Sequence, residues 1–361
     1  MRILFFGTYD AGRHPRVAVL REGLAAAGDD VLECNVPLAL DTAARVGLLR
    51  QPWRLPAAAA RLAAAWTRLR RRARLLPPPD AVVVGYLGHL DVHLARRTFR
   101  RTPIVLDHLV SLADTAADRG LADTPLARTF ARVDRAALTA ADVVCVDTEE
   151  HVGLLPPDLR ARAVVVPVGA SERWFRRPER RESVLLRVVF FGLYTPLQGT
   201  VTIGEALAEL EGAEDVTVTM VGRGQDFEAA RAAAAPNRRV AWRDWVPAGE
   251  LPDVVAGHDV CLGIFGTTPK AARVVPNKVF QGAAAGCALV TADTPPQRKA
   301  LGGAAQYVPA GDPHALAEAI RALAADRELL WGLRQSAFGR ADAAFRPANV
   351  VRPLRARLTA Q

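Results

Sequence analysis

Short apolar runs alternate with longer amphipathic segments along the whole chain. The apolar runs are rich in β-branched and aromatic residues, which is typical of parallel strands buried on both faces. They occupy residues 2–7, 30–36, 81–87, 104–107, 142–148 and 163–169 in the first half, and residues 187–192, 216–222, 259–266 and 287–293 in the second. Segments with helical spacing separate most of them. This order predicts an α/β protein built from two Rossmann-like, doubly wound domains.

The predicted alternation is interrupted once, by a charge-rich stretch without a sustained period. We therefore divide the chain into an N-terminal domain (1–170), a linker (171–186), a C-terminal domain (187–345) and a terminal segment (346–361). Two such domains form a cleft between two sheet edges, which suits an enzyme that holds a nucleotide in one half and an acceptor in the other.

The loop that follows the strand at 259–266 is the first candidate for ligand binding. Ligands of open α/β sheets bind at the carboxyl ends of strands, and the helix predicted from Asn277 offers free N–H groups and a positive end. Lys270, Arg273 and Lys278 lie within nine positions here, and they include two of the chain's three lysines. A compact ammonium is suited to phosphate. The alternative is that these are solvated loop charges.

Two loops of the N-terminal half are candidates for the opposite side of the cleft. Gly12, Arg13 and His14 lie between the first strand and the first helix, where they face an acceptor or a phosphate, or are ordinary surface residues. Asp107 and His108 leave the carboxyl end of a strand. That position is suited to chemistry or to a substrate hydroxyl, although an ordinary strand end would look the same.

Charge and cysteine content narrow the class of protein. The net charge is +9, but residues 1–175 carry 24 basic and 19 acidic side chains and the remainder carries 23 and 19. No basic half or tail exists, which argues against nucleic acid as a partner. The four cysteines are scattered in strand-like runs and are expected to be reduced core residues. The start MRILFFG is too short for a signal sequence and no long apolar span follows, so we expect a cytoplasmic protein.

One predicted helix is strongly basic. Between residues 57 and 76 the apolar residues form a single stripe, and six arginines lie at 61, 68, 70, 71, 72 and 74. Such a helix can lie on an anionic membrane, so we expect peripheral membrane contact through Arg61–Arg74 as one interpretation. The other is that the stripe packs on a sheet and the arginines are solvated.

Several segments together carry a family resemblance that covers nearly the whole chain. They are VVVPVGASERWF (164–175), FFGLYTPLQG (190–199), MVGRGQ (220–225), DWVPAGELPDVVAGHDVCL (244–262) and PNKVFQGAAAGCALVTADTP (276–295). In their order along the chain and in their residues, these segments resemble the motifs of the retaining, nucleotide-sugar-dependent glycosyltransferases of the GT-B fold, family four.

The resemblance implies transfer of a sugar from a nucleoside-diphosphate donor to an acceptor hydroxyl, with retention and without a metal or other cofactor. It implies that the donor binds the C-terminal domain, the acceptor the N-terminal domain, and that the last helices, near 348–358, cross back. The implied catalytic residues are His108 and, as a fallback, Asp107. The implied donor-binding residues are Gly192, Gln198, Arg223, Trp245, Val246, Lys270, Arg273, Asn277, Lys278 and Gln281.

The chain departs from the family pattern at three places in the expected donor site. Leu193 and Gln198 replace a basic pair, Arg273 and Gln281 replace paired glutamates, and Arg223 replaces an acid. A leaving diphosphate still needs cationic or N–H partners. The departures leave two other classes open: a catalytically impaired donor-binding partner and a sugar-nucleotide epimerase of the same shape. The sugar, the base and the acceptor, whether lipid-linked, polysaccharide or small metabolite, are not assigned by the sequence.

Overall fold

The N-terminal domain is built on a six-stranded parallel sheet with strand order β2-β1-β3-β4-β5-β6. The computed structural model describes residues 1–10, 15–38, 55–118, 121, 123–181 and 183–360. The strands are β1 (Arg2–Gly7), β2 (Asp30–Asn35), β3 (Ala81–Val84), β4 (Ile104–Asp107), β5 (Val143–Val146) and β6 (Ala163–Val165). Their residues alternate between two buried clusters, one on each face of the sheet, because a parallel sheet is covered by helices on both faces.

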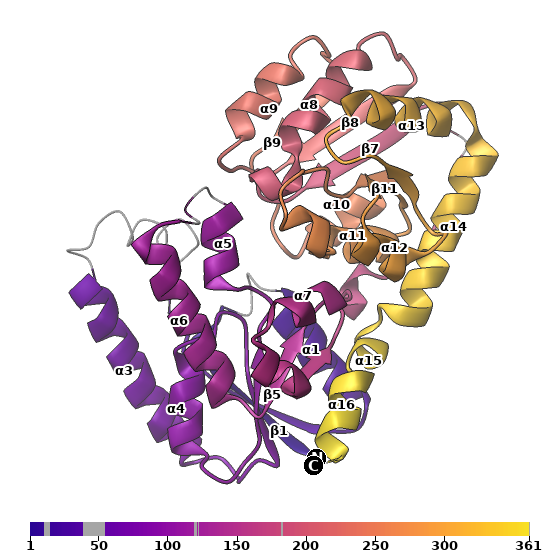
Figure 1. The fold of residues 1–361 in the computed structure, drawn as a ribbon. Coiled ribbons are helices and arrows are strands. Elements are labelled where there is room, and N and C mark those ends of the chain that lie inside the picture. Colours follow the sequence, from indigo (N-terminus) through magenta and orange to yellow (C-terminus); the bar gives the residue numbers. More distant parts are fainter. Residues whose placement is uncertain (11–14, 39–54, 119–120, 122, 182, 361) are drawn as a thin grey trace.

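Helices of this domain cover the sheet in two layers (Figure 1). One layer contains α3 (Leu55–Ala73), α4 (Asp91–Thr98) and α6 (Pro125–Ala140), and the other contains α1 (Pro15–Ala26). Two short helices, α5 (Leu112–Asp118) and α7 (Glu149–Leu154), follow β4 and β5, and the 3-10 helix η2 (Pro157–Arg162) precedes β6. Both short helices therefore lie at the carboxyl edge of the sheet.

The C-terminal domain repeats this plan with strand order β12-β11-β10-β7-β8-β9, again all parallel. Its strands are β7 (Leu186–Phe191), β8 (Val216–Val221), β9 (Val240–Arg243), β10 (Val260–Leu262), β11 (Ala288–Ala292) and β12 (Gln306–Val308). The expected fold class, two Rossmann-like domains each with its own sheet, is confirmed.

Helices also cover both faces of the second sheet. One face carries α8 (Thr200–Glu209), α9 (Phe227–Ala233) and α13 (Pro313–Ala325), and the other carries α10 (Leu251–Ala256), α11 (Asn277–Ala284), α12 (Pro295–Leu301) and α14 (Arg327–Ala344). The 3-10 helices η4 (Pro196–Gln198) and η5 (Ala271–Arg273) lie in the loops after β7 and β10. These loops are therefore at the carboxyl edge, where the sequence predicted a ligand.

The chain crosses between the domains twice. The first crossing contains η3 (Glu172–Trp174), whose Trp174 is buried and stacks on Phe191 with ring centroids 5.7 Å apart. The second follows α14 and leads to α15 (Pro347–Val350) and α16 (Arg352–Thr359). Val350, Val351 and Leu354 of this segment are buried in the N-terminal core. Both helices lie against the N-terminal domain (Figure 1).

The strand expected at 81–87 is shorter than its apolar run. It ends at Val84, and the chain then turns through Leu87, which has a left-handed φ of 57°. The sequence pattern could not show this turn because its residues remain apolar. Among the described residues, no helix is long and apolar enough to cross a membrane.

Candidate donor and acceptor site

The carboxyl edges of the two sheets meet in the crevice between the domains. Thr148, which follows β5, donates a hydrogen bond of 2.9 Å to the carbonyl oxygen of Arg273. Leu109, which follows β4, packs against a core cluster of the C-terminal domain. The loops that follow these parallel strands therefore face each other, as expected for a ligand site between two α/β domains.

Two glycines allow the loops after β7 and β8 to touch. Gly192 and Gly222 have φ values of 142° and 118°, which L side chains rarely adopt. A Cβ atom on Gly222 would lie 2.0 Å from the carbonyl oxygen of Gly192. Only glycine at 222 permits this contact, which leaves backbone, rather than side chains, at this part of the sheet edge.

A third glycine joins the β7 loop to the β10 loop. Gly199 has φ of 64°, and a Cβ there would lie 2.4 Å from the backbone nitrogen of Gly266. The N–H of Phe265 donates to the carbonyl oxygen of Gln198 over 3.1 Å. Gln198 is thereby held just before α8, at the center of the carboxyl edge.

Lys278 lies beside these loops and is buried by them. It lies in the first turn of α11, is only 4% exposed, and its Nζ is 3.6 Å from the ring centroid of Phe190. Nζ donates a hydrogen bond to Oε1 of Gln198 and lies next to Gly192. Burial lowers the pKa of Lys278 well below its usual value. Three of the predicted donor-binding residues therefore lie together around one buried amine.

Lys270 and Arg273 contact the N-terminal domain instead. Arg273 pairs with Asp114 over 2.5 Å, and Lys270 Nζ donates to Thr115 Oγ1 over 2.9 Å. Asp114 and Thr115 are on α5. Arg273 Nε is buried and has no hydrogen-bond partner among the described atoms. Both cations therefore hold the two domains together on one side of the crevice.

The remaining predicted donor residues line two parts of the same edge. Arg223 is exposed and pairs with Asp244 over 2.8 Å, and the Trp245 side chain is 75% exposed, whereas Val246 is buried. On α11, Asn277 is half-buried and begins the helix, and Gln281 is buried one turn after Lys278. Arg223 and Trp245 are thus exposed to solvent at the carboxyl edge of the second sheet, whereas Asn277 and Gln281 lie deeper, on α11.

His108 is the predicted catalytic residue, and it is buried beside a second histidine. Its ring meets that of His89 edge to face, with centroids 5.3 Å apart, and its Nδ1 has no hydrogen-bond partner among the described atoms. Burial, and then the neighbouring His89, lower the pKa of His108 to about 4. The imidazole is therefore neutral at pH 7.

His89 and Asp134 belong to the same group, and the sequence analysis missed both. His89 Nε2 lies 3.0 Å from Asp134 Oδ1, and the carboxylate also accepts from Ser111 Oγ at 2.8 Å and from the N–H groups of Leu112 and Ala113. Asp134 thus fixes the start of α5. His89 follows a predicted strand by a few residues, and this position could have marked it as a candidate site residue. Asp134 lies within a helix and gave none.

Asp107, the second candidate for the catalytic residue, forms a buried ion pair. Its Oδ1 lies 2.6 Å from Nε of Arg16, and the two side chains are 0% and 1% exposed. Arg16 also donates to the carbonyl oxygens of Val166 and Pro167. Burial raises the pKa of Asp107, and Arg16 opposes this change. The pair joins α1 to the ends of β4 and β6, so it stabilises the packing of these elements.

The predicted acceptor residues Gly12, Arg13 and His14 lie outside the described residues.

A resident metal has no evident site. Within the described parts of the chain, no three histidine, cysteine, aspartate or glutamate side chains converge in a way that could hold a metal ion. The four cysteines are free and buried.

Comparisons with known proteins agree with this architecture. HepE from Anabaena in complex with UDP-glucose is 14% identical, with a TM-score of 0.71 and 100% of both chains covered. Sucrose-phosphate synthase from Thermosynechococcus elongatus is 15% identical, with a TM-score of 0.73 and 100% of this chain and 99% of that chain covered. A UDP-forming α,α-trehalose-phosphate synthase from Burkholderia vietnamiensis is 13% identical, with a TM-score of 0.67 and 100% of both chains covered. No curated protein matches the sequence.

Two Rossmann-like domains that face each other, with the last helices returning to the first domain, define the GT-B class of glycosyltransferase folds. Residues 186–326 match the family model described as Glycosyl transferases group 1. The C-terminal domain therefore resembles the glycosyl transferases group 1 family, and the solved structures above share the fold of the whole chain.

Proposed function

We propose that the protein transfers a sugar from a nucleoside-diphosphate donor to an acceptor hydroxyl with retention of anomeric configuration. The observation that carries this proposal is the convergence of Gly192, Gln198 and Lys278 at the carboxyl edge of the second sheet. A close backbone approach, an amide and an amine beside a helix start are suited to a diphosphate.

In this proposal Lys278 is the main cation for the diphosphate. An amine held in a buried site interacts strongly with an anion because little water screens it. The donor brings the negative charge that favours its ammonium form, and that charge increases on the diphosphate as the sugar leaves. Arg273 and Lys270 supply further positive charge when they exchange their α5 partners for the donor.

Two of the similar structures suggest which nucleobase the donor of this protein carries. HepE was captured with UDP-glucose, and the trehalose-phosphate synthase carries the description UDP-forming. We therefore take UDP as the first candidate. In our proposal the exposed indole of Trp245 covers one face of the base, and Gln281 contacts the ribose through an amide that both donates and accepts.

His108 is proposed to contact the donor sugar or the acceptor hydroxyl. Its neutral imidazole has a free Nδ1 and can offer one hydrogen bond without competing as a strong base. The acceptor proton passes to an oxygen of the leaving phosphate. Gly12, Arg13 and His14, which are outside the described residues, remain the proposed acceptor-binding residues. No general base of raised pKa is required in this scheme.

A nucleotide screen followed by turnover tests the proposal. UDP, GDP, dTDP and ADP are compared by thermal shift, because a ligand that binds only the native state raises its stability. The selected nucleotide is then supplied as its sugar conjugate with candidate acceptors, and the anomer of the product is read by NMR. We expect one nucleotide to be preferred and the α or β configuration to be kept. Inversion, or no stabilisation by any nucleotide, would contradict the proposal. Binding without turnover would identify a donor-binding protein.

A further inference from the structure

Positive charge is concentrated on one layer of the N-terminal domain. Helices α3, α4 and α6 lie side by side on the outer face of the first sheet, on the side away from α14, α15 and α16 (Figure 1). Together they contain ten arginines and two aspartates, a net charge of +8 in a chain whose total is +9. The even distribution of charge along the sequence therefore hides a strong clustering in space.

Both acids of this layer point inward. Asp91 is 4% exposed and accepts hydrogen bonds from Thr8 and from Nε1 of Trp66. Asp134 is 6% exposed and caps α5. Consequently, the described side chains of the three helices present no exposed carboxylate to solvent. A solvated helix face normally mixes both signs of charge, and this one does not.

The arginines, in contrast, point outward. Five are exposed on α3, at 61, 68, 70, 71 and 72. One more is exposed on α4, at 97, and three on α6, at 128, 132 and 135. Arg135 pairs with Asp158, and Arg72 donates to the carbonyl oxygen of Asn35. The others form no ion pair with a described residue.

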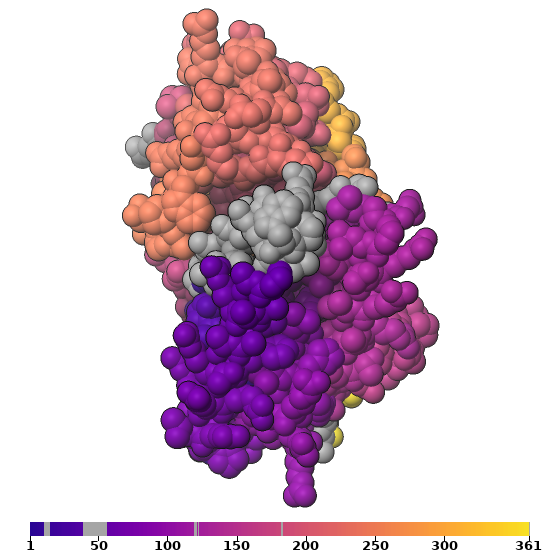
Figure 2. All heavy atoms as spheres, turned by 90° about the vertical axis from the view of Figure 1, so that its left-hand side faces the viewer, coloured from indigo at the N-terminus to yellow at the C-terminus, as the bar shows by residue number. Residues whose placement is uncertain are grey.

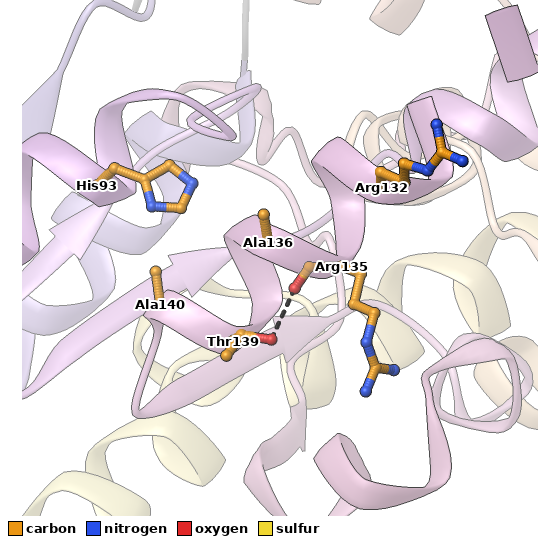
Figure 3. Close-up of a pocket in the computed structure, with 6 residues that line it drawn as sticks. All are labelled: His93, Arg132, Arg135, Ala136, Thr139 and Ala140. Atoms are coloured by element: carbon orange, nitrogen blue, oxygen red, sulfur yellow. Dashed lines mark hydrogen bonds between the residues drawn. The ribbon is translucent and has the colours of Figure 1, made fainter. Parts of the chain in front are cut away.

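Apolar groups accompany this charge. Leu75, just after α3, is 85% exposed. A shallow hollow of about 540 Å³ lies between α4 and α6 and is lined by His93, Arg132, Arg135, Ala136, Thr139 and Ala140. In Figure 3 the methyl groups of Ala136 and Ala140 lie beside the His93 ring, while both guanidinium groups point away from it. Figure 2 views the molecule from the side on which α3 lies.

We propose that this layer, which we call the arginine face, docks on the surface of an anionic phospholipid membrane. Several guanidinium groups that have no ion-pair partner among the described residues are spread over three neighbouring helices, which suits a surface that carries many phosphates. The face has no exposed aromatic side chain among its described residues, whereas single-stranded nucleic acid is bound by such rings, which favours the membrane. This inference does not depend on the proposed reaction.

Vesicle binding tests the proposal with the intact protein. Flotation is measured with vesicles of equal parts phosphatidylglycerol and phosphatidylcholine and with phosphatidylcholine alone, at low and physiological ionic strength. We expect binding to the anionic vesicles only, weakened by salt. The variant Arg68→Gln/Arg71→Gln/Arg132→Gln removes three charges from the arginine face. Since each arginine near such a surface contributes about a fivefold change, its partition coefficient should fall on the order of a hundredfold.

A matched control separates this face from general basicity. Arg177→Gln/Arg231→Gln/Arg238→Gln removes the same charge from exposed positions outside the N-terminal domain. It should bind vesicles like the wild type, and thermal unfolding should show that both triple variants are folded. Equal losses in both variants, no binding to anionic vesicles at low salt, or tighter binding to an RNA or DNA oligomer than to vesicles would overturn the proposal.

Discussion

Three buried titratable side chains lie near the crevice, and each has a different neighbour. Lys278 is next to an amide, Asp107 is next to a guanidinium, and His108 is next to another imidazole. Removal from water penalises a charge unless a partner compensates for it. Each of the three residues therefore has a different expected response to substitution or to pH.

Asp107 should be required for folding rather than for turnover. Replacing it with asparagine leaves the buried Arg16 without its counter-charge, which costs about 3–5 kcal/mol. Urea denaturation should show this loss, and the double variant Arg16→Met/Asp107→Leu should recover part of it. Asp158→Asn, in an exposed pair with Arg135, is the control and should change little. A stable Asp107→Asn protein that has lost only turnover would instead make Asp107 catalytic.

The lowered pKa of His108 predicts a loss of stability in mild acid. The unfolded histidine takes up a proton at pH values near 6.5, whereas the folded one does so only near its pKa of about 4. Stability is therefore complete above pH 6.5 and falls as the pH decreases to about 4, by about 3 kcal/mol in total. His108→Gln should lack this component, and His314→Gln, at an exposed site, should keep it. Parallel pH profiles for wild type and His108→Gln would contradict the assignment.

Lys278 should take up a proton when a nucleotide binds. Burial lowers its pKa in the free protein, and a bound diphosphate raises it again. At pH 8, where the terminal phosphate of UDP is already ionised, calorimetry in two buffers of different ionisation enthalpy measures this uptake. Lys278→Met should abolish it and weaken binding by roughly 1.5–3 kcal/mol. Lys299→Met, at an exposed lysine, should do neither. Identical heats in both buffers for the wild type would refute the prediction.

At the scale of elements, α5 is one part of the N-terminal domain that holds the second domain. Asp114, Thr115 and Asp118 contact Arg273, Lys270 and Thr268, respectively, with donor–acceptor distances between 2.5 and 2.9 Å. The helix itself is capped by Asp134 from α6. Its seven residues have no clear apolar period, so the sequence alone did not predict it. Its position depends on a carboxylate that is distant in the sequence.

Release of Arg273 from α5 should favour the donor. Asp114→Asn removes the carboxylate that pairs with Arg273, which then becomes available to the diphosphate. We expect the affinity for the nucleotide chosen by the screen to increase by up to about tenfold, or about 1.4 kcal/mol, measured by calorimetry. Asp123→Asn, at an exposed position near α6, is the control. Weaker binding in Asp114→Asn would mean that the contact between the domains builds the site rather than competes with it.

At the scale of the whole molecule, the return of the last helices depends on a glycine. A Cβ on Gly23 of α1 would lie 2.2 Å from the carbonyl oxygen of Pro347 in α15. Gly23→Ala should therefore cost about 1–3 kcal/mol and increase proteolysis near residue 345. Gly339→Ala, in α14 with open space around it, should stabilise by about 0.5–1 kcal/mol. If Gly23→Ala unfolds like the wild type, the docking of α15 is less tight than described.

The sequence predicted the fold more completely than it predicted the contacts of the candidate site. The strands are short apolar runs, so the two sheets could be predicted, and with them the position of the loop and helix start near Lys278 at the carboxyl edge. The partners of Lys270 and Arg273 could not, because pairing across the crevice depends on how the domains sit together. The His89–Asp134 contact was missed for the same reason, and of the arginine face the sequence indicated only the basic helix at Arg61–Arg74, without the arginines of α4 and α6. Each arises from residues that are distant in sequence and adjacent only in the folded chain.

The second domain crossing has a consequence for the order of folding. The core of the N-terminal domain is completed by Val350, Val351 and Leu354, which are synthesised after nearly everything else. The C-terminal sheet, by contrast, is built from one continuous stretch, residues 186–308. During translation the later domain can therefore finish first, while the apolar side chains of α1 that pack on α15 and α16 stay uncovered until residues 347–358 have been synthesised.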